Sequence, residues 1–461
     1  MVGFWDKLYQ SDSLTAKCLS LSRHYGTFRN TYSFLKKSQW WSREELEAYQ
    51  LQQLKQLVHH AYENVPYYQR VFDERNLKPE DIQSLSDLQK LPFLTKDIVR
   101  ENLEDLKAQN YPEEAFEYVT TGGSTGIPLG FYYESGVSRA KEWAFMKTQW
   151  DRVGYHFHDK CVILRGNVIN SSDTEKYWEK SFFGRWLVLS SYHLTQENVS
   201  NYISEIKKFG PKYIQAYPST IIILAKHMQE NQIKPIQTLK AILCGSENIY
   251  PWQRELVEKM FQCRVYSWYG NSEQVVLAGE CEYNQEYHIF PEYSIFELIR
   301  NDGTPIHHNH EIGEVVGTGL NNYIFPLIRY RTMDHATLNS KDKCKCGRNY
   351  FRLDKVVGRQ HEYIVTERGN LIAMTAINMH SDIFDNVHQF QFYQEKKGEV
   401  FLHLVKKYTY TDHDSQNILQ ALHHKMGDEV RVELKFVDEI PRTKSGKYRF
   451  LIQEISINDR D

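Results

Sequence analysis

The chain has 461 residues, of which 41% are hydrophobic and 25% charged, as in an ordinary globular protein of more than one domain. Its 56 Lys and Arg against 59 Asp and Glu give a net charge of -3, so charge indicates neither a nucleic-acid nor an anionic-membrane partner. Charged residues soon follow Met1, no long apolar stretch occurs, and the seven cysteines lack the spacing of a disulfide scaffold. We therefore expect a cytoplasmic protein without a signal peptide or transmembrane segment.

The first quarter of the chain is predicted to be mainly helical. Within residues 1–115, the segment from Glu44 to Tyr62 carries leucines at near-helical spacing, and Val65-Pro66 then ends the pattern. Residues 84–96 are expected to form a connector with short helical turns, interrupted by Pro92.

From Tyr118 onwards the pattern alternates between strands and helices. The apolar runs 161–164 and 241–244 are predicted to be buried strands, and helices are expected at 198–208 and 219–229. This alternation predicts an α/β fold.

The last hundred residues form a different pattern. Apolar residues alternate with polar ones on both sides of the turn at 396–398, an amphipathic helix is expected at 415–426, and another strand at 430–436. We place a domain boundary after Gly358. Residues 1–358 would then form a large domain and residues 359–461 a small α+β domain.

Two loops far apart in the sequence indicate the chemistry. The first reads Thr120-Thr121-Gly122-Gly123-Ser124-Thr125-Gly126-Ile127-Pro128, and its glycines and hydroxyls suit an anion-binding nest for phosphate, although it lacks the ending of a Walker A motif. The second, Pro441 to Lys447, presents a lysine from a predicted turn. Together the loops suggest an enzyme that joins a carboxylate to the α-phosphate of ATP and releases pyrophosphate.

Further motifs in the chain resemble those of the adenylate-forming enzymes, specifically the phenylacetate–CoA ligase branch. Ser272 replaces the threonine of that family, and Met333 replaces its glycine. The resemblance covers nearly the whole chain. In chain order, the matching segments are Val65-Pro66-Tyr67-Tyr68, Asp87 to Lys96, the phosphate loop, Ala216-Tyr217-Pro218-Ser219, Cys244-Gly245-Ser246-Glu247, Tyr269-Gly270-Asn271-Ser272-Glu273, Arg329 to Asp334, Gly358-Arg359 and Pro441 to Lys447.

The site must neutralise two anions, ATP and the acid, and hold them in line. Glu273 would hold Mg²⁺, a cation that prefers oxygen ligands, and Asp334 can accept hydrogen bonds from the ribose hydroxyls. Lys447 would bridge the carboxylate and the α-phosphate as charge develops. The other expected nucleotide contacts are the loop Thr120 to Gly126, Ser246, Glu247, Tyr269, Gly270, Asn271, Ser272 and Arg359. Tyr217, Pro218 and Gly245 would border the acid pocket.

The resemblance also implies that the small domain rotates between adenylation and acyl transfer. The family's hinge residue is charged and stands two positions after the arginine. His361 occupies that position here, which leaves its use as a hinge open.

A second group of residues suits a metal. Cys344-Lys345-Cys346 is a Cys-x-Cys knuckle, and Cys281 and His288 lie upstream. Three thiolates and one imidazole suit a closed, structural zinc site, because no ligand position remains for water. Similar arrangements occur in the phenylacetate ligase branch.

Three functions remain open. The resemblance implies an AMP-forming ligase that passes the acyl group to coenzyme A. The segment Gln360 to Thr366 resembles CapK-like relatives of capsular-polysaccharide clusters, in which an amine or sugar would be the acceptor. A non-catalytic binding protein on the same fold is the third reading. A homodimer is among the states we expect.

Overall fold

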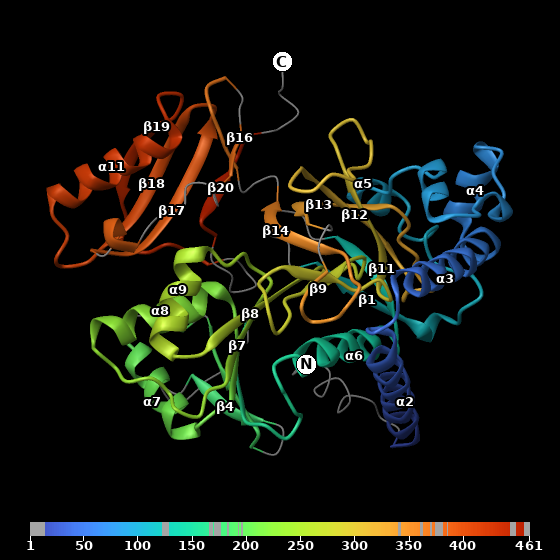
Figure 1. Cartoon of the computed structure of the whole chain (residues 1–461), viewed down its shortest axis with the longest axis horizontal. Helices are drawn as coiled ribbons and strands as arrows, with labels where there is room; N and C mark the ends of the chain where they lie inside the picture. Colours follow the sequence, from blue (N-terminus) through green and yellow to red (C-terminus); the bar gives the residue numbers. More distant parts are fainter. Residues whose placement is uncertain are drawn as a thin grey trace. The chain divides into compact units, whose positions relative to one another are not determined.

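The computed structural model describes residues 14–121, 129–165, 169, 177–181, 184–191, 193–194, 197–339, 343–359, 363–368, 371–373, 381–384, 386–442 and 449–455. The chain divides into two compact units (Figure 1). Unit 1 comprises residues 1–156 and 268–355, and unit 2 comprises residues 157–267 and 356–461.

Unit 1 begins with the expected helical region. Helix α3 starts at a capping box, in which the Ser42 hydroxyl accepts from the Glu45 backbone N–H and the Glu45 carboxylate accepts from the Ser42 N–H. Its buried face carries Leu46, Leu54 and Leu57, as the leucine spacing predicts. The helices of this unit are α2 Leu14–Ser38, α3 Arg43–Asn64, α4 Pro66–Glu74, α5 Lys96–Glu101 and α6 Ser138–Asp151, with short turns η1 Pro79–Asp81, η2 Leu85–Lys90 and η3 Glu113–Ala115.

The strands of unit 1 form an antiparallel hairpin and a larger sheet. The hairpin consists of β1 Phe116–Thr120 and β2 Gly130–Glu134. In the larger sheet the spatial order is β11-β12-β13-β14-β10-β9-β8. These strands are β8 Arg264–Gly270, β9 Leu277–Gly279, β10 Tyr287–Ile289, β11 Ser294–Ile299, β12 Ile312–Gly319, β13 Tyr330–Leu338 and β14 Arg352–Arg359.

Unit 2 contains the predicted α/β pattern. Strands β5, β3, β6 and β7 are parallel neighbours, and β4 adds an antiparallel edge. A right-handed crossover helix between parallel strands is the usual connection in such sheets. The elements are β3 Cys161–Leu164, β4 Trp178–Ser181, β5 Trp186–Leu189, α7 Val199–Phe209, β6 Tyr213–Ala216, α8 Pro218–Glu230, β7 Ala241–Gly245 and α9 Pro251–Phe261.

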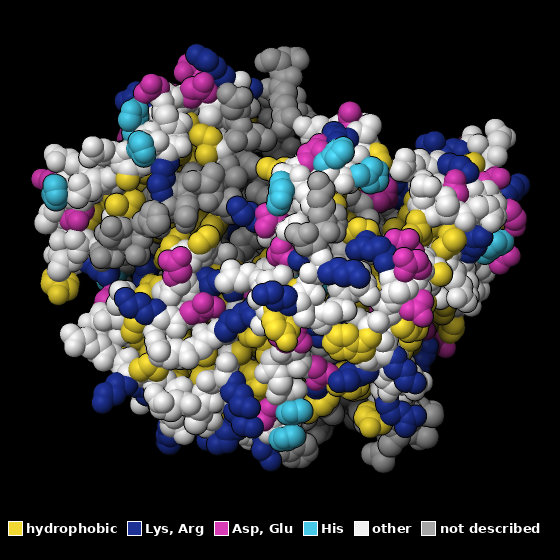
Figure 2. Space-filling model, viewed as in Figure 1, with side chains coloured by type: hydrophobic (Ala, Val, Ile, Leu, Met, Phe, Trp, Pro, Cys, Tyr) yellow, Lys and Arg dark blue, Asp and Glu magenta, His cyan; other side chains and the backbone are white. Residues whose placement is uncertain are grey.

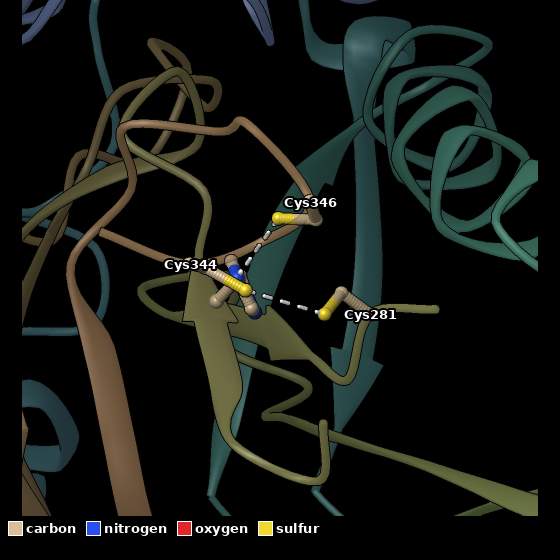
Figure 3. Close-up of side chains that lie close together, drawn as sticks. Cys281, Cys344 and Cys346 are labelled. Atoms are coloured by element: carbon tan, nitrogen blue, oxygen red, sulfur yellow. Dashed lines mark hydrogen bonds between the residues drawn. The ribbon is translucent and has the colours of Figure 1, made fainter. Parts of the chain in front are cut away.

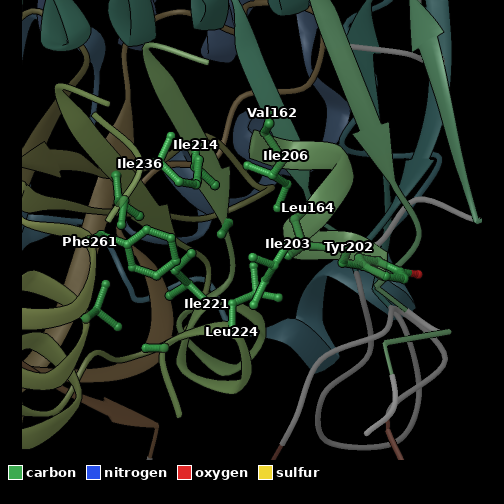
Figure 4. Close-up of a cluster of buried hydrophobic side chains, with 14 of the residues drawn as sticks. Val162, Leu164, Tyr202, Ile203, Ile206, Ile214, Ile221, Leu224, Ile236 and Phe261 are labelled. Carbon is green, nitrogen blue, oxygen red and sulfur yellow. The ribbon is translucent and has the colours of Figure 1, made fainter. Parts of the chain in front are cut away.

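One face of this sheet forms a large apolar core (Figure 4). Val162, Leu164 and Ile214 project from the strands toward the apolar stripes of the helices. Those stripes include Tyr202, Ile203 and Ile206 of α7, Ile221 and Leu224 of α8, and Phe261 of α9. Removing a fully buried isoleucine side chain from such a core costs about 2–5 kcal/mol.

The C-terminal segment of unit 2 has its own sheet and helix. Its strand order is β19-β18-β17-β20, and Ile418 and Leu422 of α11 lie in a core with Phe392 and Leu402 of the sheet. The elements are β15 Tyr363–Val365, β16 Leu371–Ala373, η5 Ser381–Phe384, β17 Val387–Lys396, β18 Glu399–Lys406, α11 Asp412–Met426, β19 Arg431–Phe436 and β20 Leu451–Gln453.

The expected α/β class is confirmed. The predicted strands and helices of unit 2 are present, and the majority of their ends lie within two residues of the predicted ends. The boundary after Gly358 stays a prediction, and it falls near the end of β14. Among the described residues, no helix is long and apolar enough to cross a bilayer. On the face shown in Figure 2, Lys and Arg side chains lie among Asp and Glu side chains, in keeping with the small net charge.

Candidate nucleotide site and metal centre

Two motifs that lie far apart in the sequence are adjacent in unit 1. Leu94 forms a parallel bridge with Tyr330, in which the Leu94 N–H donates to Arg329 O (3.0 Å) and the Arg331 N–H donates to Leu94 O (2.9 Å). The buried Arg329 guanidinium binds both oxygens of Glu297 and donates to Leu91 O at 2.7 Å. Arg329 therefore links the sheet to the connector, and its contacts stabilise the fold.

A β-bulge in β13 follows directly. The register against β12 shifts between Glu314 and Val316, and Met333 lies in the left-handed region with φ 64°. The Thr332 hydroxyl donates to Val315 O (2.8 Å) and accepts from the Asp334 N–H (3.0 Å). The bulge thus sets the direction of Asp334, and it explains why glycine suits position 333 in the related sequences.

The carboxylates of Asp334 and Glu273 each accept a hydrogen bond from a tyrosine hydroxyl. Tyr269, at the end of β8, donates to Asp334 Oδ2 at 2.8 Å. Tyr330 donates to Glu273 Oε1 at 2.9 Å, and Glu273 is only 6% exposed. The expected residues Tyr269, Glu273 and Asp334 are thereby brought together through side-chain contacts between β13 and the end of β8, although these two strands are not neighbours in the sheet. Tyr330 was missed as a site residue, although it stands inside the quoted arginine motif.

The turn after β8 carries three further expected residues. Asn271 Oδ1 accepts from the Val275 N–H at 3.0 Å, whereas its buried Nδ2 has no hydrogen-bond partner among the described residues. Ser272 is exposed, and its carbonyl accepts from the Tyr133 hydroxyl. A Cβ on Gly270 would lie 2.9 Å from Leu277 Cδ1, so a larger residue there would require that leucine side chain to shift. A buried, unsatisfied amide donor suits a bound polar ligand.

In unit 2, the expected acid-pocket residues lie at the carboxyl ends of parallel strands, where α/β sheets commonly bind ligands. Tyr217 precedes α8, Pro218 is its first residue, and Gly245 ends β7. Glu247 accepts from the Ser219 N–H (2.9 Å) and hydroxyl (3.0 Å), so both oxygens contact the start of α8.

Beside these loops lies an arginine that the sequence analysis did not single out. Arg165 follows β3 and donates to the hydroxyl of Ser246 at 2.9 Å, and Ser246 has φ 69°. Its guanidinium lies 5.6 Å from the centre of the Tyr217 ring. Burial is the main reason that its pKa is lowered. A charged residue directly after a buried strand was the available signal.

Several expected residues cannot be placed. Gly122, Gly123, Ser124, Thr125, Gly126, His361 and Lys447 lie outside the described residues, as does the side chain of Arg359. Thr120 ends β1. Thr121 pairs with Leu129 through its backbone N–H (2.9 Å), and its hydroxyl accepts from the Leu129 N–H (2.9 Å), so the hairpin is closed at the base of the predicted phosphate loop.

The predicted zinc ligands form one cluster in unit 1. The ligand atoms of Cys281, His288, Cys344 and Cys346 all lie within 4.8 Å of one another (Figure 3). Cys281 Sγ and Cys344 Sγ are 3.6 Å apart, and Cys346 Sγ is 3.4 Å from His288 Nε2. A tetrahedral Zn²⁺ with Zn–S bonds of about 2.3 Å requires edges of roughly 3.5–3.8 Å. The geometry therefore fits a zinc ion.

The cluster also favours deprotonated sulfur at one position. The pKa of Cys346 is lowered to about 2, because Cys281 and then His288 donate hydrogen bonds to its sulfur. The pKa of Cys281 is raised, first by this interaction with Cys346 and then by burial. A thiol must lose its proton when it binds a metal, so the lowered pKa of Cys346 favours cation binding at this position.

Comparisons with known proteins identify relatives of two kinds. Residues 364–454 match the family model of the CapK C-terminal domain. Protein CapK of Staphylococcus aureus is 25% identical over 89% of this chain and 90% of its own length. The phenylacetate-coenzyme A ligase of Aromatoleum evansii is 29% identical over 72% of this chain and 74% of its own length.

A solved structure supports the fold. The 2-hydroxyisobutyryl-CoA ligase in its postadenylation state matches with a TM-score of 0.71 at 18% identity, over 90% of both chains. The motifs and the relatives agree that the chain is similar to the adenylate-forming ligases of the branch that includes CapK and the phenylacetate–CoA ligases, and the solved structure shows that it shares their fold.

Proposed function

We propose that the protein is an AMP-forming carboxylate ligase that makes an acyl-adenylate and transfers the acyl group to coenzyme A. The arrangement that carries the proposal is the pair of tyrosine–carboxylate contacts, Tyr330 with Glu273 and Tyr269 with Asp334. They hold two buried carboxylates, one on β13 and one in the turn after β8, and a carboxylate is a suitable ligand for a hard cation. The relatives named phenylacetate-coenzyme A ligase, which cover over two thirds of the chain, support the reaction class.

In the first step, a carboxylate oxygen of the acid attacks the α-phosphorus of ATP, and the bond to pyrophosphate breaks. Glu273 would bind Mg²⁺ through the oxygen that Tyr330 does not occupy, and this cation neutralises phosphate charge. Asp334 would accept the ribose hydroxyls, and the buried Nδ2 of Asn271 would donate to the nucleotide. Lys447 would bridge the two reacting anions.

In the second step, the thiolate of coenzyme A attacks the acyl carbonyl and AMP leaves. We propose that the small domain, residues 359–461, rotates near His361 between the two steps, as the family resemblance implies. The Cys281, His288, Cys344 and Cys346 cluster would hold one zinc ion in a purely structural role, because the four protein ligands complete its coordination.

A second candidate keeps the adenylation step and changes the acceptor to an amine or a sugar in surface-polysaccharide synthesis. The CapK relative is matched over 90% of its length, against 74% for the Aromatoleum ligase, and the C-terminal segment matches the CapK family model. The phenylacetate-coenzyme A ligase of Thermus thermophilus is also matched over 96% of its length, so the family model is what separates the two candidates. This observation favours the second candidate for the transfer step. We also propose a cytoplasmic location and a homodimer.

The experiment is acid-dependent pyrophosphate release by the full chain with ATP and Mg²⁺. The acids are phenylacetate, other aryl acids, uronic acids and short fatty acids, each with and without coenzyme A. Turnover of an aryl acid only with coenzyme A supports the first candidate. Pyrophosphate release that does not depend on coenzyme A supports the amine or sugar acceptor. If none of the acids causes pyrophosphate release, both candidates are contradicted.

A further inference from the structure

Glu142 is a partly buried carboxylate in unit 1 that the proposed reaction does not use. It lies on α6, and its Oε2 accepts from the Tyr293 hydroxyl at 2.5 Å. Burial raises its pKa to about 7, against an opposing effect of the Tyr293 hydrogen bond. Keeping an ionisable group in such a place is unfavourable for folding, and groups of this kind gather at functional sites.

The same oxygen also contacts the residue that follows Glu273. Gln274 Nε2 lies 3.4 Å from Glu142 Oε2 and 3.4 Å from Ser138 O, so its side chain reaches both the first residue of α6 and Glu142 one turn later. Gln274 is 4% exposed and has φ 57°. A non-glycine residue in this region is strained and persists only where its surroundings hold it.

The opposite side of this turn rests directly on β12. A Cβ on Gly317 would lie 2.3 Å from Val275 O, and one on Gly319 would lie 2.9 Å from Gln274 O. Both clashes involve backbone atoms, so the strand can approach only because these two residues are glycines. The turn that carries Glu273 is therefore clamped between the backbone of β12 and the side chains of α6.

The charged and titratable groups around Glu142 come from four elements. Tyr293 precedes β11, Tyr133 lies on β2 and donates to Ser272 O, and Glu273 follows β8. Arg139 of α6 lies 5.2 Å from the centre of the Tyr133 ring. The pKa values of Tyr133 and Tyr293 are raised by burial first, and both Glu142 and Glu273 add to the effect. The two carboxylates thus act on the same tyrosines.

We propose that Glu142 is a positioning residue for Glu273: through Gln274 it fixes the strained turn that directs the cation-binding carboxylate. It does not touch the reacting atoms. This inference rests on the proposed function, in which Glu273 binds Mg²⁺. It implies that nucleotide binding weakens when Glu142 is replaced by an apolar residue of similar length, whereas an equally destabilising change at a buried carboxylate outside the turn leaves binding unchanged.

The test uses the full chain with Glu142→Met and Glu142→Gln. Methionine removes the acceptor and the buried charge, whereas glutamine keeps an acceptor oxygen. We expect Glu142→Met to melt at a lower temperature, because it leaves the buried Tyr293 hydroxyl and the Gln274 amide without their acceptor. We expect it to weaken Mg²⁺–ATP binding, measured by calorimetry, about tenfold, and Glu142→Gln to stay within about threefold of wild type.

A matched control is Glu292→Met. Glu292 is 1% exposed, and its Oε1 accepts from Tyr350 (2.9 Å) and Ser38 (2.6 Å), with no contact to the turn at 271–275. This variant should leave Mg²⁺–ATP binding unchanged. Where pyrophosphate release is measurable, Glu142→Met should raise the KM for Mg²⁺–ATP and leave the KM for the acid within about twofold.

The outcomes separate this inference from the proposed function. Equal Mg²⁺–ATP affinity in wild type and Glu142→Met overturns the positioning role, even if the enzyme turns over. Weakened binding in Glu142→Met, in a protein that activates no acid, supports the positioning role and contradicts the proposed reaction. A wild-type chain that binds no Mg²⁺–ATP contradicts both.

Discussion

The hydroxyl of Tyr330 donates to Glu273 Oε1 at 2.9 Å, although 57 residues separate the two in the sequence. The contact joins the arginine motif of β13 to the turn after β8, and it occupies one of the two oxygens of Glu273. The remaining oxygen is the one that the proposed reaction requires for the cation.

Tyr330→Phe should therefore impair cation-dependent nucleotide binding while it leaves the ring packing intact. Loss of a hydrogen bond to a buried charged group costs about 1.5–3 kcal/mol, which corresponds to a KM for Mg²⁺–ATP raised roughly ten- to hundredfold. Steady-state kinetics with varied Mg²⁺–ATP measures this.

Tyr350→Phe is the matched control, because Tyr350 donates to the buried Glu292 at the same distance of 2.9 Å outside the site. It should lower the melting temperature with no change in KM. If Tyr330→Phe and Tyr350→Phe raise the KM for Mg²⁺–ATP equally, the Tyr330 contact stabilises the fold and has no specific role in nucleotide binding.

Met333→Gly should stabilise the protein slightly. The left-handed conformation at φ 64° costs a non-glycine residue about 1–2 kcal/mol, and glycine removes most of that strain at the expense of a more flexible unfolded chain. We expect a gain of up to about 1 kcal/mol in the free energy of unfolding, measured with denaturant.

Ile312→Gly provides the comparison for this substitution. Ile312 begins the paired strand β12 and is 53% exposed, and its φ is not among the positive values. Glycine there should destabilise by about 0.5–1 kcal/mol. Destabilisation by Met333→Gly as large as that of Ile312→Gly would refute strain at the bulge.

Removal of zinc should destabilise unit 1. We expect about one zinc ion per chain by elemental analysis, and its removal by a chelator should lower the free energy of unfolding by more than about 2 kcal/mol. Cys346→Ser should do the same, whereas Cys263→Ser, at a thiol outside the cluster, should retain the metal. If the purified protein contains no zinc and is equally stable with and without chelator, the predicted metal centre is wrong.

Glu142 should make stability fall as pH rises. Its pKa in the folded protein, about 7, lies above the ordinary value of 4.5, so unfolding releases its proton at intermediate pH. The stability from this group is fully present below pH 4.5 and is lost as pH rises through about 7, by up to roughly 3 kcal/mol.

Denaturant unfolding of wild type and Glu142→Gln between pH 5 and pH 8 measures this loss as a difference between the two proteins. The free energy of wild type should drop relative to the variant over that interval. Parallel curves would show that Glu142 titrates normally.

Much of the secondary structure of unit 2 could be predicted from the sequence, because it follows from the pattern of apolar residues within single segments. The apolar runs that became β3 and β7 are buried throughout, and the stripes of α7 and α8 repeat at helical spacing. The candidate carboxylates were predicted by motif, and so were the four residues that the structure brings into one cluster.

What the sequence could not supply were contacts between distant segments. The pairing of Leu94 with Tyr330, the bulge at Met333 and the contact between Glu142 and Gln274 depend on strand order and register, which no local periodicity encodes. Met333 looked like a departure from the family pattern, and the structure shows that the backbone there keeps the left-handed conformation that glycine would adopt.

The central claim is that this chain forms an acyl-adenylate, and the most direct test is acid-dependent exchange of labelled pyrophosphate into ATP. The assay reports the reversible first step and needs no acyl acceptor. Wild type should show exchange with at least one acid of the panel, and Lys447→Ala should lose at least a hundredfold of it while keeping most of its ATP binding. Exchange at the wild-type rate in Lys447→Ala, or ATP binding without exchange for any acid, would contradict the claim.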